Sequence, residues 1–154
     1  MEIKPNDNHI AILLTLVLLI AIIPFLVLGA YVRFQADDYC SSSLFRTEGF
    51  WNAQRSSYLY WSGRYATIFV TGIIDKLGLL GIQILPSLLI LGLLGSSYLI
   101  FNNLGRCLNK SFPKSLLFCI SAAVTFFTVI TTPNAYQSYY WRSGSLTYTL
   151  PIIA

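Results

Sequence analysis

Three long stretches of this sequence carry no charged side chain. They cover residues 10–32, 77–101 and 115–132. With a rise of about 1.5 Å per residue, a helix of about 20 residues crosses the roughly 30 Å hydrocarbon core of a bilayer. Charged residues make up only 10% of the chain, against about 25% in soluble domains. The sequence therefore predicts an all-α integral membrane protein with three transmembrane helices.

The first apolar stretch stands near the amino terminus, where a secretory signal peptide would be found. Signal peptides carry an apolar run of about 7–15 residues, followed by small residues at the cleavage site. The run at residues 10–32 is longer, and no small-x-small pattern follows it. We therefore interpret it as an uncleaved anchor and as the first of the three spans.

The segment between the second and third apolar stretches is basic. Residues 102–114 contain two lysines and one arginine and no acidic residue. Because short basic loops stay on the cytoplasmic side, the positive-inside rule predicts a cytoplasmic loop here. The amino terminus then also lies in the cytoplasm, and residues 33–76 and 133–150 form two loops on the outer face.

Within the first outer loop, residues 58–76 have the pattern of an amphipathic helix. A polar stripe is formed by residues spaced three or four apart, namely Arg64, Thr67, Thr71 and Asp75. Aromatic and aliphatic residues occupy the neighbouring face. A helix with two such faces lies in the membrane interface rather than crossing the bilayer. We expect this position, because a spanning helix here would place the basic loop outside.

The cysteines and the net charge exclude several classes of site. Cys40, Cys107 and Cys119 fall in the outer loop, the cytoplasmic loop and the third span. This separation predicts no disulfide bond and no metal site. The net charge of +4 comes from dispersed residues, so we expect no nucleic-acid binding. We expect no cofactor, and the sequence leaves a requirement for a divalent metal open.

Acidic, cationic and aromatic residues gather in the two outer loops. The candidate site residues are Asp37, Asp38, Trp61, Arg64, Tyr140, Trp141 and Arg142. Transfer of a sugar from a lipid phosphate needs a carboxylate that takes a proton from the acceptor hydroxyl. It also needs cations that hold the leaving phosphate, which arginine does with two hydrogen bonds. Aromatic rings supply an apolar surface for the sugar. These residue types therefore favour a site for a sugar and a phosphate.

Each of these residues also has a structural interpretation. An Asp pair that follows a span can be a solvated helix cap, and Tyr and Trp at this depth form the interfacial belt of many membrane proteins. Arginines near a membrane surface can serve as anchors whose charged ends reach water. The functional interpretation is favoured only because all of these residues are expected on the same face of the membrane.

Three short segments, in this order, resemble the beginning of GT-C membrane glycosyltransferases. They are Ala-Asp-Asp-Tyr at residues 36–39, Trp-Ser-Gly-Arg at residues 61–64, and Tyr-Trp-x-x-Gly-x-x-x-Tyr at residues 140–148. The chain is most similar to bacterial O-antigen glucosyltransferases (GtrII-like proteins) and their poorly characterised relatives. The resemblance covers essentially the whole chain.

The resemblance implies transfer of a sugar from a polyprenyl-phosphate donor to a cell-surface glycan, lipid or protein at the bacterial inner membrane. Asp37 and Asp38 match the acidic pair of the family, in which one residue would act as the base. We assign Arg64 and Arg142 to the phosphate from their charge and sidedness. Such enzymes have many more spans than three, and residues 151–154 begin a fourth. We therefore expect an amino-terminal fragment that is inactive alone.

Two other functions compete with the enzyme. A small membrane scaffold or accessory subunit would use the aromatic outer loops to bind a partner. A transporter or channel is less favoured, because transporters keep ionisable residues inside their spans and the three apolar stretches have none.

Overall fold

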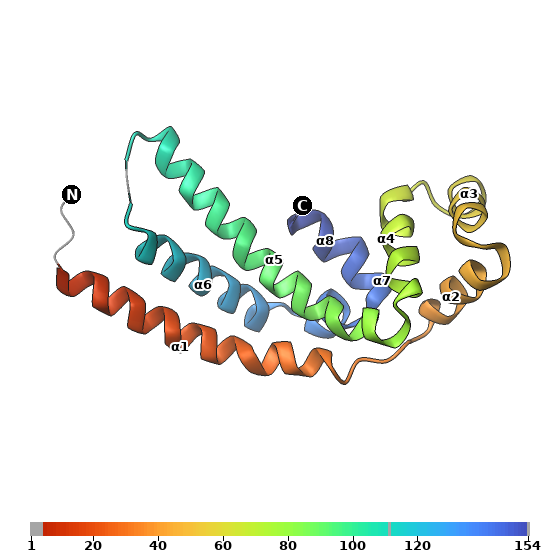
Figure 1. Ribbon diagram of the computed structural model, residues 1–154, viewed down its shortest axis with the longest axis horizontal. Helices are drawn as coiled ribbons and strands as arrows, with labels where there is room; N and C mark the ends of the chain where they lie inside the picture. Colours follow the sequence, from red (N-terminus) through yellow and green to blue (C-terminus); the bar gives the residue numbers. More distant parts are fainter. Residues whose placement is uncertain (1–4, 111, 154) are drawn as a thin grey trace.

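The computed structural model describes residues 5–110 and 112–153. These residues are helical almost throughout and include no strand, which confirms the all-α prediction. Three long helices lie side by side along the molecule (Figure 1). They are α1 (Pro5–Gly29), α5 (Gly78–Cys107) and α6 (Lys114–Thr131).

Each long helix is long and apolar enough to cross a membrane. The mean hydropathy is 3.2 over Asn8–Gly29, 2.0 over Gly78–Cys107 and 1.8 over Lys114–Thr131. The outward faces of these helices are apolar too; on α1, Leu13 and Ile20 are 63% and 65% exposed. Exposed aliphatic side chains of this number suit contact with lipid tails. The number of candidate spans predicted from the sequence is therefore confirmed.

The second long helix extends beyond the predicted end at residue 101. It ends at Cys107 with a Schellman motif. In this motif the amide of Lys110 donates to the carbonyl of Gly105 at 3.0 Å. The amide of Asn109 donates to the carbonyl of Arg106, also at 3.0 Å. Asn109 has a φ of 52°, as this motif requires. Residues 102–107 of the expected loop are consequently helical, and we call residues 106–110, where the helix ends, the basic turn.

Residues 58–76, which were expected to form one helix, contain the end of one helix and the whole of another. The first outer segment forms α2 (Asp37–Glu48), α3 (Phe50–Tyr60) and α4 (Tyr65–Lys76). The helix breaks after Tyr60, because the amides of Trp61 and Ser62 both donate to the carbonyl of Ser57 and Gly63 follows. The prediction of one continuous helix over residues 58–76 is therefore wrong, and the connection at residues 61–64 separates α3 from α4.

The polar stripe of α4 also faces a different way from the expected one. Thr71 is buried, and Asp75 bonds with side chains of other helices, so this part of the stripe faces the protein. Phe69 of the apolar face packs its ring against Phe50 of α3. Thr71 and Asp75 therefore face polar side chains of the protein, whereas Arg64, at the other end of the stripe, is exposed.

The second outer segment is helical rather than a loop. It forms the π-helices η1 (Tyr136–Tyr140) and η2 (Ser145–Thr149), with α7 (Arg142–Gly144) between them and α8 (Leu150–Ile153) after them. The side chain of Ile153 lies against Gly92 of α5. Of the expected fourth span, residue 154 lies outside the described residues.

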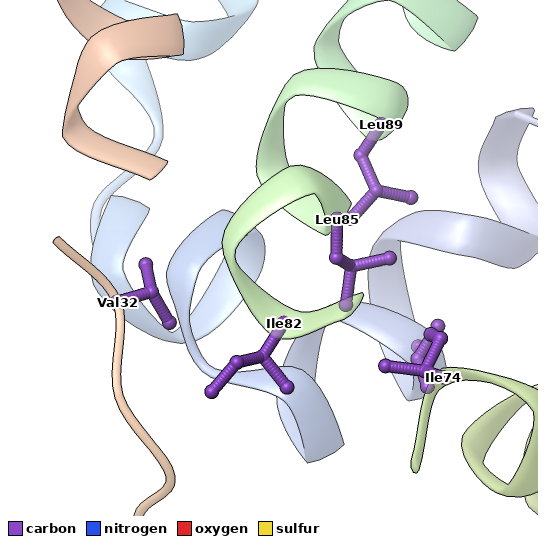
Figure 2. Packing of buried hydrophobic residues seen from close by; sticks show 6 residues of the cluster. Val32, Ile74, Ile82, Leu85 and Leu89 are labelled. Carbon is purple, nitrogen blue, oxygen red and sulfur yellow. The ribbon is translucent and has the colours of Figure 1, made fainter. Parts of the chain in front are cut away.

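Two buried clusters join these segments to the bundle. The first connects the end of α1, α4, α5 and η2, and consists of Val32, Ile74, Ile82, Leu85, Leu89 and Leu146 (Figure 2). The second connects α1, α5, α6 and η1 through Ile22, Ile90, Val129 and Tyr139. Together they fix the short helices at the end of the bundle that is opposite the basic turn (Figure 1).

The close packing of α7 against η1 requires a glycine at residue 144. A Cβ atom added at Gly144 would overlap the carbonyl oxygen of Gln137 and lie 2.9 Å from the Trp141 ring. We expect Gly144→Ala to lower the free energy of unfolding by about 1–3 kcal/mol, as overpacking of a buried site does. Thermal unfolding in detergent measures this change. Gly95→Ala is the matched control, because Gly95 faces open space within α5 and alanine favours a helix. Equal stability of the two variants would contradict the prediction.

Candidate functional site

Arg142 lies at the centre of a buried ionic cluster that joins three helices. Its Nε is 3.3 Å from Oδ1 of Asp38, and its Nη1 is 3.4 Å from Oδ1 of Asp75. The side chains of Arg142, Asp38 and Asp75 are 0%, 1% and 8% exposed. The guanidinium of α7 therefore pairs with one carboxylate of α2 and one of α4.

Further hydrogen bonds complete the ionic cluster. Nη2 of Arg142 donates to the backbone carbonyl of Asp38 at 2.8 Å, and Oγ of Ser143 donates to Oδ1 of Asp38 at 2.7 Å. The hydroxyl of Ser42 donates to the Asp75 carboxylate, and the Phe34 ring lies 5.4 Å from Cζ of Arg142. Buried charges are tolerated only when they are paired and hydrogen-bonded in this manner.

A strained turn precedes the two adjacent aspartates at the start of α2. Ala36, before α2, has φ 37° and ψ −111°, a sparsely populated conformation that costs an L-residue about 1–3 kcal/mol. It is held by hydrogen bonds from the Asp38 amide to the Gln35 carbonyl at 2.7 Å and from the Gln35 amide to Asp38 Oδ2 at 3.2 Å. Asp38 is thereby buried, whereas Asp37 stays exposed at the start of the helix.

A cavity of about 460 Å³ lies beside the ionic cluster. Its walls come from α2, α3, α4, the connection at residues 61–64, and the segment from Trp141 to Tyr148. Asp37 and Arg64 are the charged residues in the lining, and Ser and Thr hydroxyls are frequent. The aromatic residues of the lining are Phe45, Tyr60, Trp61, Trp141 and Tyr148. The cavity thus combines a carboxylate, a guanidinium, hydroxyls and aromatic rings.

Four of the seven predicted site residues line this cavity. They are Asp37, Trp61, Arg64 and Trp141. Asp38 lies behind the cavity wall. Ser143 lines the cavity and donates a hydrogen bond to the Asp38 carboxylate. The two aspartates, which are equivalent by sequence, therefore have different environments.

The position of Arg142 does not suit contact with a phosphate. Its guanidinium is fully buried and already bonds to Asp38 and Asp75, so the phosphate assignment is corrected. The cause is the proximity of two carboxylates from separate helices, which hold the cation inside the protein. Asp75, Ser42 and Ser143 were not among the predicted site residues. The signal for Asp75 was a carboxylate within an otherwise apolar stretch.

Tyr140 faces the helix bundle instead of the cavity. Its hydroxyl donates to the carbonyl of Phe25 on α1 at 2.9 Å. Burial, and then the neighbouring Tyr139, raise the pKa of Tyr140, which keeps this donor protonated. Burial, and then the charge of Asp38, likewise raise the pKa of Tyr136. Tyr140 and the buried Tyr139 thus connect the segment to the bundle.

The described residues 5–110 and 112–153 include no group of three side chains arranged to hold a metal ion. Cys40 and Cys107 are exposed, Cys119 is half-buried, and all three are free thiols. No protein-family model, curated protein or solved structure matches this chain.

Proposed function

We propose that this chain forms the sugar-phosphate site of a membrane glycosyltransferase that uses a polyprenyl-phosphate sugar as donor. The observation that carries the proposal is the cavity, in which Asp37, Arg64, Trp61 and Trp141 meet at one end of three apolar helices. A lipid-linked donor has its tail in the bilayer and its phosphate and sugar at the membrane surface. A cavity that combines charged groups, hydroxyls and aromatic rings at the end of an apolar bundle suits such a molecule.

Asp37 and Arg64 have separate roles in the proposed reaction. Asp37 takes the proton of an acceptor hydroxyl while the oxygen of that hydroxyl forms a bond to the anomeric carbon of the sugar. The bond from that carbon to the phosphate oxygen breaks, and the polyprenyl phosphate leaves with the electron pair. Arg64 stabilises this anion through charge-assisted hydrogen bonds. The acceptor is a hydroxyl of a cell-surface glycan or lipid.

The proposal places the cavity on the outer face of the bacterial inner membrane. The basic turn between α5 and α6 lies at the opposite end of the bundle, and short basic segments stay in the cytoplasm. The exposed aromatic side chains of the α3 region then lie at the outer interface. Among them, Trp51 is 73% exposed and Tyr60 is 86% exposed.

Two exposed cysteines test this orientation. Cys40 lies at the cavity end, and Cys107 lies at the basic turn. A membrane-impermeant maleimide should label Cys40 in intact spheroplasts and spare Cys107, because only one end of the bundle is accessible. Permeabilised cells should show both labels, and Cys40→Ser and Cys107→Ser assign them. Labelling of Cys107 alone in intact cells would reverse the orientation.

Arg64 tests the phosphate contact. Arg64→Ala should weaken binding of a short-chain polyprenyl-phosphate hexose by about 10–100-fold, since a hydrogen bond to a charged group contributes about 1.5–3 kcal/mol. The dissociation constant is measured on protein in lipid nanodiscs. Arg55→Ala is the matched control, because Arg55 is an exposed cation of α3 that does not line the cavity.

Equal weakening by Arg55→Ala would indicate a general charge effect instead of a phosphate contact. If the unaltered protein binds no lipid phosphate sugar, the glycosyltransferase proposal fails. The exposed aromatic surface of α3 then favours the scaffold, which binds a partner protein.

A further inference from the structure

A backbone conformation that disfavours alanine stands directly before the two aspartates. Ala36 has φ 37° and ψ −111°, close to the values of about 60° and −120° for the first central residue of a type II′ turn. The amide of Asp38 donates to the carbonyl of Gln35 at 2.7 Å and closes this turn. Glycine is the usual residue here, because a Cβ atom makes a positive φ unfavourable. The turn therefore carries strain that other contacts must offset.

The side chain of Asp38 supplies those contacts. Its Oδ2 accepts a hydrogen bond from the Gln35 amide at 3.2 Å, so the carboxylate bridges the two ends of the turn. Its Oδ1 accepts from Nε of Arg142 at 3.3 Å and from Oγ of Ser143 at 2.7 Å. Strained residues persist only where the surroundings fix them. Asp38 is fixed by the buried ionic cluster, whereas Ala36 is exposed and its methyl group adds little packing.

The turn sets the direction in which the Asp37 side chain leaves the backbone. Asp37 follows Ala36 as the first residue of α2, and it lines the cavity. The amide of Tyr39 donates to the carbonyl of Ala36 at 3.2 Å, so the first turn of α2 is built on this residue. On the other side, Val32 is fixed in the first buried cluster. If Ala36 relaxed to a negative φ, the start of α2 would turn relative to Val32, and the Asp37 side chain would turn with it.

We propose that Asp38 is a positioning residue for Asp37. The Asp38 carboxylate clamps the strained turn at Ala36 and thereby holds the Asp37 carboxylate in the cavity. This inference rests on the proposed function and deepens it, because it gives the second aspartate a role in the reaction. Asp38 acts through the backbone and does not contact the donor or the acceptor.

Strain at Ala36 distinguishes this role from two others. If Asp38 were the general base, no change in the backbone would restore the reaction after its loss. If Asp38 were only the structural partner of Arg142, the effect of its loss would not depend on residue 36. A clamp, in contrast, is needed only while residue 36 resists the turn. Glycine adopts a positive φ without strain, so Ala36→Gly should remove the need for the clamp.

The test is a cycle of Asp38→Ala and Ala36→Gly in the natural full-length protein, with hexose transfer measured in membranes at matched expression. Asp38→Ala removes the clamp but leaves Arg142 its second partner, Asp75. It should slow transfer by about 10–100-fold, since strain of this kind shifts a conformational equilibrium by about that factor. Adding Ala36→Gly should recover about tenfold or more of this loss. Its effect in the otherwise unaltered protein should be much smaller, because the clamp is intact.

Ala36→Val tests the same point without disturbing the ionic cluster. A β-branched residue is a stronger outlier at a positive φ than alanine. Because Ala36 is exposed, the larger side chain need not overlap the core. We expect Ala36→Val to slow transfer by about tenfold or more. This variant decides the matter if Asp38→Ala is too unstable to accumulate.

Two controls separate the clamp from general effects on stability. Ala66→Gly and Ala66→Val change an exposed alanine of α4 that lies outside the cavity lining. Ala66→Gly should not restore Asp38→Ala, and Ala66→Val should not slow transfer. Asp75→Ala removes the other carboxylate of the ionic cluster, which bonds to Ser42 and Arg142 and not to the amide of Gln35. Ala36→Gly should therefore not restore Asp75→Ala.

Hydrogen exchange reports the turn without an assay of sugar transfer. The backbone amides at positions 38 and 39 donate to the carbonyls of Gln35 and Ala36. In nanodiscs, we expect Asp38→Ala to speed exchange at these amides by about 10–100-fold, and we expect added Ala36→Gly to slow it again. The amides of α6 serve as the reference for global stability.

The inference is overturned if Ala36→Gly restores neither the rate nor the exchange of Asp38→Ala. It is also overturned if Ala36→Gly restores Asp75→Ala equally well, or if Ala36→Val changes neither measurement. Transfer that depends on Asp37 without any such rescue contradicts the clamp alone. If the unaltered protein transfers no sugar, the proposed function fails, and restored exchange then still supports the clamp on the turn.

Discussion

Asp37→Asn should reduce sugar transfer by about 10²–10⁴-fold, the usual contribution of a general base. Asp37 is the carboxylate in the cavity lining, and it is exposed. Asparagine keeps its size but cannot take the acceptor's proton. The measurement is transfer of radiolabelled hexose from a polyprenyl-phosphate donor by membranes that contain each variant of the natural full-length protein at matched expression. A rate equal to that of the unaltered protein would contradict the assignment.

Glu48→Gln is the matched control for this prediction, since Glu48 is an exposed acid at the far end of the same helix and does not line the cavity. Asp38→Asn should also lower the rate, but for another reason. Asp38 pairs with Arg142 behind the cavity wall, so its loss should first appear as reduced thermal stability. Full stability of Asp38→Asn with abolished transfer would instead make Asp38 the base.

Arg142→Met should lower the free energy of unfolding by about 3–5 kcal/mol, because it removes the cation from between two buried carboxylates. Asp38 and Asp75 would then face each other without a compensating charge, 1% and 8% exposed. Thermal unfolding or resistance to denaturing detergent measures the change. This cost is a large part of the stability of a small domain, so we also expect reduced expression.

Arg64→Met is the matched control for Arg142→Met, because Arg64 is exposed and its replacement should change stability by no more than about 0.5 kcal/mol. A triple variant that combines Arg142→Met with Asp38→Asn and Asp75→Asn should recover much of the lost stability, since no buried charge is left. If Arg142→Met is as stable as Arg64→Met, the ionic cluster does not hold these helices together.

The sequence by itself determined the three long apolar helices and the order of the polar segments between them. Uncharged runs of this length favour helices, because their side chains are apolar and the backbone satisfies its own hydrogen bonds. The basic residues of segment 102–114 predicted a connection between the second and third spans, and the acidic and aromatic segments were predicted to share the opposite face of the membrane. These are properties of single segments or of their order, so they can be read without knowing how the helices pack.

Only the tertiary structure decided which polar residues face the cavity. Neighbours on a helix point about 100° apart, so the sequence cannot tell whether Asp37 or Asp38 is buried until the facing helices are placed. Arg142 pairs with Asp38 across 104 positions of the sequence, and no local pattern encodes that contact. The local pattern also does not show what Thr71 and Asp75 face, because a polar stripe on a helix can face either water or a buried arginine. The packing of α2, α4 and α7 brought the carboxylates to the cation, and the cost of leaving a buried charge unpaired keeps them there.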